Sequence, residues 1–200
     1  MEASEQISGR DLGRIAAFTD GVMAVAITLL VLNIDVPDVT EGELRDALID
    51  LLPSVYIYVL SFAVIGRFWM IHHSLFETLV RFDGMLMFLN LVFLLLVALL
   101  PFATDLLGEY PDSGLATASF SVSVALASLA HWAMSTYSVR RGFVHERHVT
   151  SYTGRRAISA LAIGVIFIVA APLAFVATEI SHVLWIGTFL VRYPLRRLAT

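Results

Sequence analysis

Six long runs of apolar residues, separated by short polar links, follow one another along the chain. About 20 predominantly apolar residues in a helix are needed to cross the hydrocarbon core of a bilayer, and each run is close to that length. The pattern therefore predicts an all-α integral membrane protein with six transmembrane helices, at approximately 12–34, 53–77, 82–107, 115–139, 157–177 and 180–195. Because no link is long enough to form a soluble domain, we expect residues 1–200 to be one six-helix transmembrane domain.

The charged residues between the predicted helices indicate how the chain is oriented. The links after the first, third and fifth helices contain ten carboxylates and only one basic residue, Arg45. The N-terminal segment, the links after the second and fourth helices and the C-terminal segment contain eleven of the thirteen arginines, among them Arg81, Arg140 and Arg147. Since basic residues remain on the cytoplasmic side of a membrane, both termini are expected to be cytoplasmic.

The overall composition agrees with membrane insertion and excludes several classes of function. Of the 200 residues, 58% are hydrophobic and 15% are charged, and the mean hydropathy is +0.81. A chain of this length buries too little surface to hide so many apolar side chains from water, so most of them must face lipid. The absence of cysteine excludes disulfides and thiolate-bound metals. No basic patch interleaved with aromatic residues is present, so a nucleic-acid partner is not expected.

A few polar residues interrupt the apolar helices, and ionisable groups in a membrane are costly enough to suggest a role. Asp20, His72, His73 and Asn90 are predicted to lie in the cytoplasmic half of the first three helices. We expect them to share one depth, where hydrogen bonds among a carboxylate, imidazoles and an amide offset the cost of burial. Such a network either holds the helices together or carries protons. The second possibility predicts a proton-coupled transporter that uses Asp20 and His72 or His73.

The histidines do not indicate a metal site, and no catalytic group is evident. His72 and His73 are adjacent and point about 100° apart on a helix, so they cannot easily bind one ion. His73 and Glu77 have the spacing of a helical metal pair, but the sequence offers no third ligand near them. No serine or threonine has a histidine and a carboxylate at matching depth. We therefore expect no metal, no organic cofactor and no enzymatic activity, and we expect His131 to be a packing residue with satisfied hydrogen bonds.

The first helix has a pattern of its own. At about 100° per residue, one narrow stripe of small side chains is formed by Ala17, Gly21, Ala24 and Thr28. Val25, Leu29 and Leu32 lie beside this stripe, and Asp20 points about 140° away from Val25. A stripe of small residues lets another helix approach closely, so periodicity alone favours a packing face.

The start of the same helix resembles a known family signature. Arg14, Phe18, Thr19 and Asp20 match the RxxxFSD motif of the TMEM175 potassium channels, with Thr19 in place of the usual serine. The resemblance continues through GVMAVAITLLVLNI in the first helix, FWMIHHSLF at the end of the second and LNLVFLLLVALLPFATDLLGEY in the third. Beyond the third helix the resemblance is generic.

This resemblance implies a function and an assembly. Prokaryotic TMEM175 proteins are homotetramers of six-helix chains, in which the first helices of four chains line a central pore that has no TVGYG filter. The chain is accordingly expected to be a potassium-permeable cation channel of a bacterial plasma membrane. Its flux is expected to be passive, with K⁺ as the transported ion, with lipid and further copies of itself as partners, and with no bound cofactor.

The family also assigns roles to residues of the pore. By their positions after the signature, Val25, Leu29 and Leu32 are expected to narrow the pore. Thr28 is expected to add a ring of hydroxyl groups between them. A ring of aliphatic side chains is poorly wetted and closes a pore by dewetting.

A polar network is expected to hold the first helix in place. Asp20 points away from the pore axis, so its carboxylate is available to accept hydrogen bonds from His72, His73 or Asn90. Trp69, one turn before His73, is included in this network. Its role would be to pack the helices rather than to conduct ions.

Overall fold

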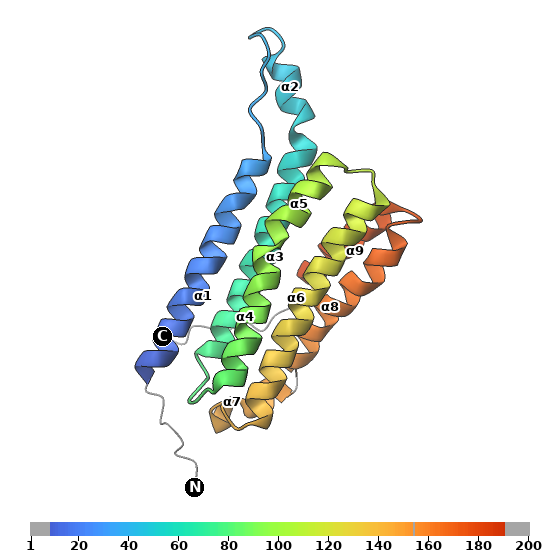
Figure 1. The fold of residues 1–200 in the computed structure, drawn as a ribbon. Coiled ribbons are helices and arrows are strands. Elements are labelled where there is room, and N and C mark those ends of the chain that lie inside the picture. The colour runs from blue at the N-terminus through green and yellow to red at the C-terminus, as the bar shows by residue number, and fades with distance from the viewer. Residues whose placement is uncertain (1–8, 154, 191–200) are drawn as a thin grey trace.

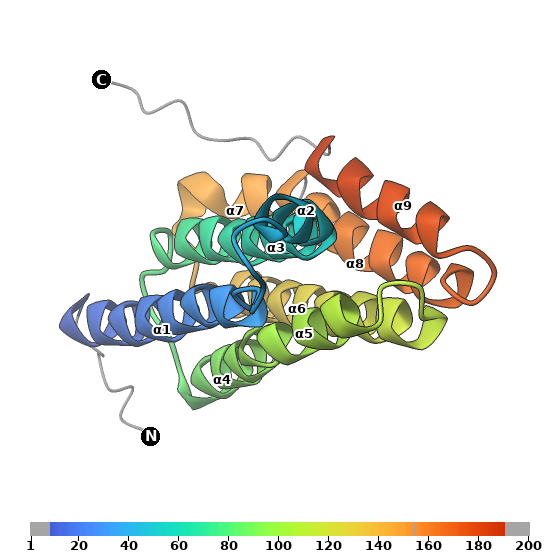
Figure 2. The ribbon, with the colours of Figure 1, turned by 90° about the horizontal axis from the view of Figure 1, so that it is seen from above.

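The chain folds into a bundle of helices that lie side by side (Figure 1). The computed structural model describes residues 9–153 and 155–190. In chain order the described helices are α1 (Gly9–Leu29), the 3₁₀ helix η1 (Leu30–Asn33), α2 (Leu44–Asp50), α3 (Leu52–Phe76), α4 (Gly84–Ala98), α5 (Leu100–Glu109), α6 (Gly114–Arg140), α7 (Glu146–Thr153), α8 (Arg155–Leu173) and α9 (Thr178–Leu190). Seen from above, α1 lies at one end of a flattened bundle, and α8 and α9 lie at the other (Figure 2).

Several helical segments are long and apolar enough to cross a membrane. In the described part of the chain they are Leu12–Leu32, Leu52–Phe76, Gly84–Glu109 and Gly114–Arg140. These segments confirm the first four predicted spans. α8 and α9 occupy the places of the fifth and sixth, but the apolar part of α8, Leu161–Leu173, is shorter. The predicted end of the sixth span, at residue 195, lies outside the described residues.

Two of the predicted spans differ from the observed helices. The third span is divided into α4 and α5 at Leu99, because Pro101 has no N–H with which to continue the helical ladder and fits the first turn of a new helix. The fifth span was predicted to reach residue 177, but α8 ends at Leu173, where the carbonyl of Leu173 accepts from two N–H groups of the following turn. The basic link after the fourth span contains one further helix, α7.

Aromatic side chains fill the interior of the bundle. The largest fully buried residues are Trp185, Phe68, Phe93, Phe120 and Phe167. Trp185 of α9 donates a hydrogen bond from Nε1 to Ser121 Oγ of α6 at 3.1 Å. α8 packs closely on α6 because Gly164 has no side chain there, and a Cβ on it would lie 3.2 Å from the Cβ of Ser128. The small residues of α6 thus provide the contact surface for α8.

The end of the bundle opposite the start of α1 carries an acidic hairpin. The chain leaves η1 in an extended conformation, and α2 projects beyond the other helices (Figure 1). The carboxylates in this segment are Asp35, Asp38, Glu41, Glu43, Asp46 and Asp50. Glu43 Oε2 accepts hydrogen bonds from the hydroxyl and the backbone N–H of Thr40, and these bonds lower the pKa of Glu43 below its ordinary value. Glu43 therefore stays ionised at neutral pH.

Candidate functional site

α1 has one buried face and one exposed face. The residues buried against the bundle are Thr19, Met23, Ala26 and Leu30. On the opposite side the small residues Ala17, Gly21, Ala24 and Thr28 are all exposed. At about 100° per residue the exposed positions cover about half of the circumference, with Gly21 and Thr28 at the centre. The stripe of small residues therefore does not pack against any other helix within residues 9–153 and 155–190.

Three aliphatic residues form a ridge along this exposed face. Val25 is 57% exposed, Leu29 is 42% exposed and Leu32 is 70% exposed. Leu32 lies in η1, and residues three apart eclipse one another in a 3₁₀ helix. Leu29 and Leu32 therefore point to nearly the same side, and the ridge continues across the change of helix type.

Thr28 presents hydrogen-bond acceptors on the same face. Its Oγ1 donates to the carbonyl oxygens of Ala24 at 3.0 Å and Val25 at 2.9 Å. A hydroxyl has one hydrogen and two lone pairs, and here the hydrogen is directed to the helix's own backbone. The lone pairs remain available, so Thr28 suits a cation better than an anion.

An apolar groove of about 450 Å³ runs beside the ridge, between α1 and α4. Its lining residues are Phe18, Gly21, Val22, Val25, Ala26, Leu29 and Ala98. Val25 and Leu29 belong both to the ridge and to the groove. The two features together give α1 a continuous surface on which another helix can pack.

The buried face of α1 is joined to α3 and α4 by a chain of polar side chains. Asn90 Nδ2 donates to Thr19 Oγ1 at 3.1 Å, and Asn90 Oδ1 lies 2.8 Å from His72 Nε2. All three side chains are buried. The ring of His72 stacks on Phe76 and Phe93, with centroid distances of 4.2 and 5.5 Å. Thr19, Asn90 and His72 thus satisfy one another inside the bundle.

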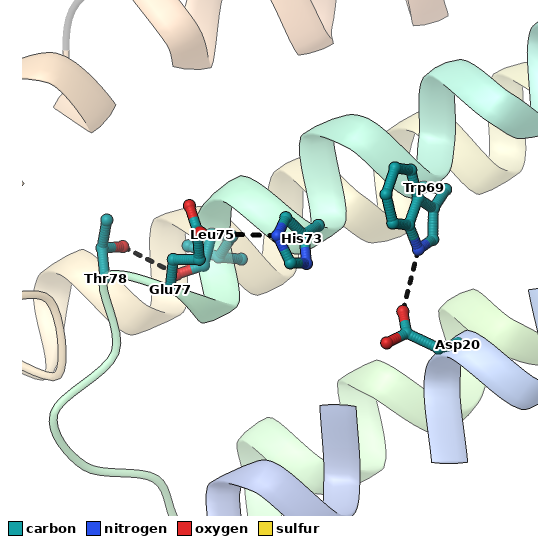
Figure 3. A network of polar contacts seen from close by, with 6 residues as sticks. All are labelled: Asp20, Trp69, His73, Leu75, Glu77 and Thr78. Carbon is teal, nitrogen blue, oxygen red and sulfur yellow. Dashed lines mark hydrogen bonds and ion pairs between the residues drawn. The ribbon is translucent and has the colours of Figure 1, made fainter. Parts of the chain in front are cut away.

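A second polar row lies on the outside of α3. Figure 3 shows Trp69 directed from α3 toward Asp20 on α1, and Trp69 Nε1 donates to Asp20 Oδ1 at 2.8 Å. The indole stacks on the ring of His73 with 5.2 Å between centroids. His73 Nε2 lies 3.4 Å from Glu77 Oε1, and these two side chains are 48% and 55% exposed. The row therefore links Asp20 of α1 to the exposed side chains of His73 and Glu77 on α3.

The polar residues expected to form one network are thus divided into two. Thr19 is bonded to Asn90 and Asp20 is bonded to Trp69, because successive residues of a helix point about 100° apart. The expectation that Asp20 accepts hydrogen bonds from His72, His73 or Asn90 is therefore wrong, and its donor is Trp69. Thr19 was not foreseen as a partner of Asn90, although its hydroxyl is a natural acceptor for an amide. Trp69 is one turn from His73 and therefore shares its face of α3. Because a histidine on this face was expected to donate to Asp20, the same spacing could have indicated Trp69 as the donor.

The remaining predicted residues have simpler surroundings. His131 is buried, with its ring 5.5 Å from that of Phe93 and 6.4 Å from that of His72. Its side chain thus packs among aromatic rings, as expected. Arg14 is exposed near the start of α1. Within residues 9–153 and 155–190 no three histidine or acidic side chains come close enough to hold a metal ion.

Comparison with known proteins places the chain among membrane channels. A family model described as the endosomal/lysosomal potassium channel TMEM175 matches residues 14–101. A protein of Streptomyces collinus named a potassium channel is 38% identical over 175 residues, which cover 84% of this chain and 85% of that protein. Human TMEM175, named an endosomal/lysosomal proton channel, is 31% identical over 189 residues, but the match covers only 38% of the human protein.

A solved structure shows the same fold. The crystal structure of a lysosomal potassium-selective channel TMEM175 homolog from Chamaesiphon minutus superposes with a TM-score of 0.79 and 30% sequence identity. The superposition covers 91% of this chain and 96% of that one. The Streptomyces relative and this structure both match over most of their length, and the family model includes the signature residues of α1. The chain belongs to the TMEM175 family.

Proposed function

We propose that four copies of the chain form a potassium-permeable cation channel whose central pore is lined by α1. The observation that carries the proposal is the exposed half of α1, centred on Gly21 and Thr28. The exposed faces of α4 and α8 carry bulky side chains instead, such as Leu95 and Ile168. Small residues are typical of helix surfaces that meet other helices. This face of α1 is therefore suited to contact with further copies of the chain.

The ridge on α1 supplies the constriction in this proposal. Four copies around a shared axis bring the side chains of Val25, Leu29 and Leu32 together as rings. Aliphatic rings make a narrow, poorly wetted passage that opens when the helices move apart. The hydroxyl oxygen of Thr28 lies on the same face and can replace part of the water shell of a cation. The relatives named as potassium channels support K⁺ as the ion.

The proposed topology has six spans and cytoplasmic termini. In this proposal α8 and α9 add a fifth and a sixth span to the four long ones. The bundle end at which α1 begins carries Arg81, Arg140 and Arg147. The acidic hairpin around α2 lies at the other end (Figure 1). This distribution supports an arrangement with the basic end inside. The bacterial relatives support a bacterial plasma membrane. Conduction is passive and requires no cofactor and no catalytic residue.

Currents from the reconstituted protein test the proposal. Leu29→Ala or Leu32→Ala is expected to raise the unitary conductance and to loosen ion selectivity, because a smaller side chain widens and wets the ring. Ile168→Ala is the matched control, since this side chain is 48% exposed on α8, at the far end of the bundle from α1 (Figure 2). Its conductance is expected to equal that of the unmodified protein. Currents that are indifferent to both leucines would refute α1 as the pore lining.

Two further measurements separate this proposal from its alternatives. A solubilised particle with the mass of four chains is expected, and a monomeric particle would contradict the shared pore. The proton-coupled transporter that uses Asp20 and His72 or His73 is the second candidate, and the human relative named a proton channel makes it worth testing. A reversal potential that follows the proton gradient and ignores K⁺ would favour it over the potassium channel.

A further inference from the structure

Two loops are fastened together at the end of the bundle where α1 begins (Figure 1). They connect α3 to α4 and α6 to α7. We call residues 77–83 and 140–147, which include the last residue of α6 and the first two of α7, the clasp. Leu79 and Val144 pair as an antiparallel bridge, and both are buried. Backbone hydrogen bonds of 2.8 and 3.0 Å between the loops flank this bridge. The pairing fixes the position of one loop relative to the other.

Gly142 allows the chain to enter this pairing directly from the end of α6. Its φ of 68° is in the left-handed region, which glycine adopts without strain. Its N–H and that of the next residue bond back to carbonyls of the last turn of α6 at 3.0 and 2.9 Å, as in a Schellman motif. This helix end holds the backbone of Arg140 and Arg141 against the other loop.

The bridge brings the arginine-bearing parts of both loops into one region. Arg81 follows Leu79 by two residues, and Arg140 and Arg141 precede Val144 by four and three residues. Arg141 has a partner, because its guanidinium lies 3.6 Å from Asp83 Oδ2 and 5.9 Å from the centres of two aromatic rings. In the described part of the chain Arg81 and Arg140 form no ion pair, and both are exposed.

The carboxylate of Asp83 is already committed to other groups. It accepts a hydrogen bond of 2.6 Å from the hydroxyl of Tyr137 and one of 2.9 Å from a backbone N–H in the first turn of α4. Partial burial raises the pKa of Asp83, but these bonds and the charge of Arg141 outweigh it, and the pKa lies below its ordinary value. Asp83 therefore stays ionised and offsets the charge of Arg141. The clasp also contains Glu77 and Glu146, but among the described residues neither forms an ion pair with Arg81 or Arg140.

The clasp lies at the level where the apolar helices end. The apolar segment Gly84–Glu109 begins directly after the first loop, and Gly114–Arg140 ends at the second. In the proposed orientation this is the headgroup region of the inner leaflet. Like charges in one region repel one another, and an anion bound between them offsets that repulsion. A phosphate is the anion that suits a guanidinium, because its oxygens accept two parallel N–H bonds.

We propose that Arg81 and Arg140 bind the phosphate group of an anionic lipid headgroup in the inner leaflet. The bound lipid joins the α3–α4 and α6–α7 loops and stabilises the inner end of the bundle. The inference rests on the proposed orientation of the chain in the membrane and does not depend on ion conduction. A free phosphate ion has the same chemistry, so the experiment must separate the two sources.

Thermal unfolding of the full chain in a neutral detergent tests the proposal. Added phosphatidylglycerol is expected to raise the unfolding midpoint, because a ligand that binds only the folded state stabilises it. Phosphatidylcholine and sodium phosphate at the same concentrations are expected to leave it unchanged. The double variant R81Q/R140Q is expected to bind phosphatidylglycerol roughly thirtyfold more weakly. Arg45→Gln, which removes one charge at the acidic end of the bundle, is the matched control and is expected to respond as the unmodified protein does.

Each alternative outcome has a definite meaning. An undiminished response of the double variant to phosphatidylglycerol would overturn the proposal, and so would an equal response of the unmodified protein to sodium phosphate, which would indicate a site for free phosphate. If R81Q/R140Q does not fold, R81K/R140K provides the test, since it keeps the charge but loses the two parallel N–H bonds, and weaker binding is expected. Potassium currents in phosphatidylcholine membranes are measured separately, so a failure of lipid binding leaves the channel proposal intact.

Discussion

Replacing Asn90 with alanine is expected to destabilise the protein far more than replacing Ser61 with alanine. Both residues are buried, and each joins two or more helices by hydrogen bonds between side chains. Ser61 Oγ accepts from Thr104 of α5 at 2.9 Å. Asn90 connects Thr19 and His72. The variants differ in what each one leaves behind.

The expected magnitudes follow from the partners that remain. The hydroxyl of Thr104 can also donate to the carbonyl oxygen of Leu100, which lies 2.8 Å from Thr104 Oγ1. Ser61→Ala therefore removes one hydrogen bond and leaves no buried polar group without a partner. An interhelical bond in a membrane contributes about 0.6 kcal/mol on average. Asn90→Ala removes two such bonds and leaves the buried imidazole of His72 unpaired, which costs about 1–3 kcal/mol more. The totals are about 0.6 kcal/mol for Ser61→Ala and roughly 2–4 kcal/mol for Asn90→Ala.

Thermal unfolding in detergent measures the difference. For a chain of this size about 1 kcal/mol shifts the unfolding midpoint by about 2–4 °C. We therefore expect a loss of about 1–3 °C for Ser61→Ala and of roughly 5–15 °C for Asn90→Ala. Equal losses would refute the reasoning that the orphaned imidazole, and not the number of interhelical contacts, determines the cost.

Two further predictions concern helix ends. Gly114→Ala would place a Cβ 2.7 Å from the carbonyl oxygen of Ala174. This overpacking is expected to lower the free energy of unfolding by about 1–3 kcal/mol. Gly66→Ala is the control and is expected to be neutral or stabilising, because nothing lies within 4 Å of the added Cβ. Because the pKa of Asp83 in the folded protein lies below the ordinary value of 3.8, its contribution to stability is present above about pH 3.8 and is lost as the pH falls through the folded value. Asp83→Asn should therefore lower the unfolding midpoint at neutral pH and flatten its dependence on acid pH, and an unchanged acid dependence would contradict this role.

The length and place of the long helices could be predicted from the sequence, because a run of apolar residues is a local property of the chain. The first four spans and their order agree with the structure for this reason. The positions of the acidic and basic links could be predicted from the sequence for the same reason. Even the break of the third span at Leu99 has a local cause, since Pro101 follows it. The shorter α8 and the additional helix α7 were not foreseen, because their ends depend on turns whose bonds are made across the loop.

Hydrogen-bond partners between helices could not be assigned from spacing in the same way. Helical periodicity gives the direction of Thr19 relative to Asp20, but it does not give the rotation of α1 against α3 and α4. A rotation of α1 by one residue position would bring Asp20, instead of Thr19, to face Asn90. The sequence therefore identified the polar residues without pairing them, and it placed Asp20 with the wrong donor. The hydrogen bond between Asn90 of α4 and Thr19 of α1 could be identified only from the packed structure.

The two polar contacts of α1 explain why its exposed face is defined so clearly. Thr19 is held from the side of α4 and Asp20 is held from the side of α3. Two bonds from neighbouring positions, about 100° apart around the helix, fix its rotation more firmly than two bonds on one line would. With that rotation fixed, Gly21 and Thr28 must point away from the bundle. Thr19 and Asp20 of the signature thus fix the rotation that leaves Val25, one turn further along, and Thr28, two turns further along, on the exposed face of α1.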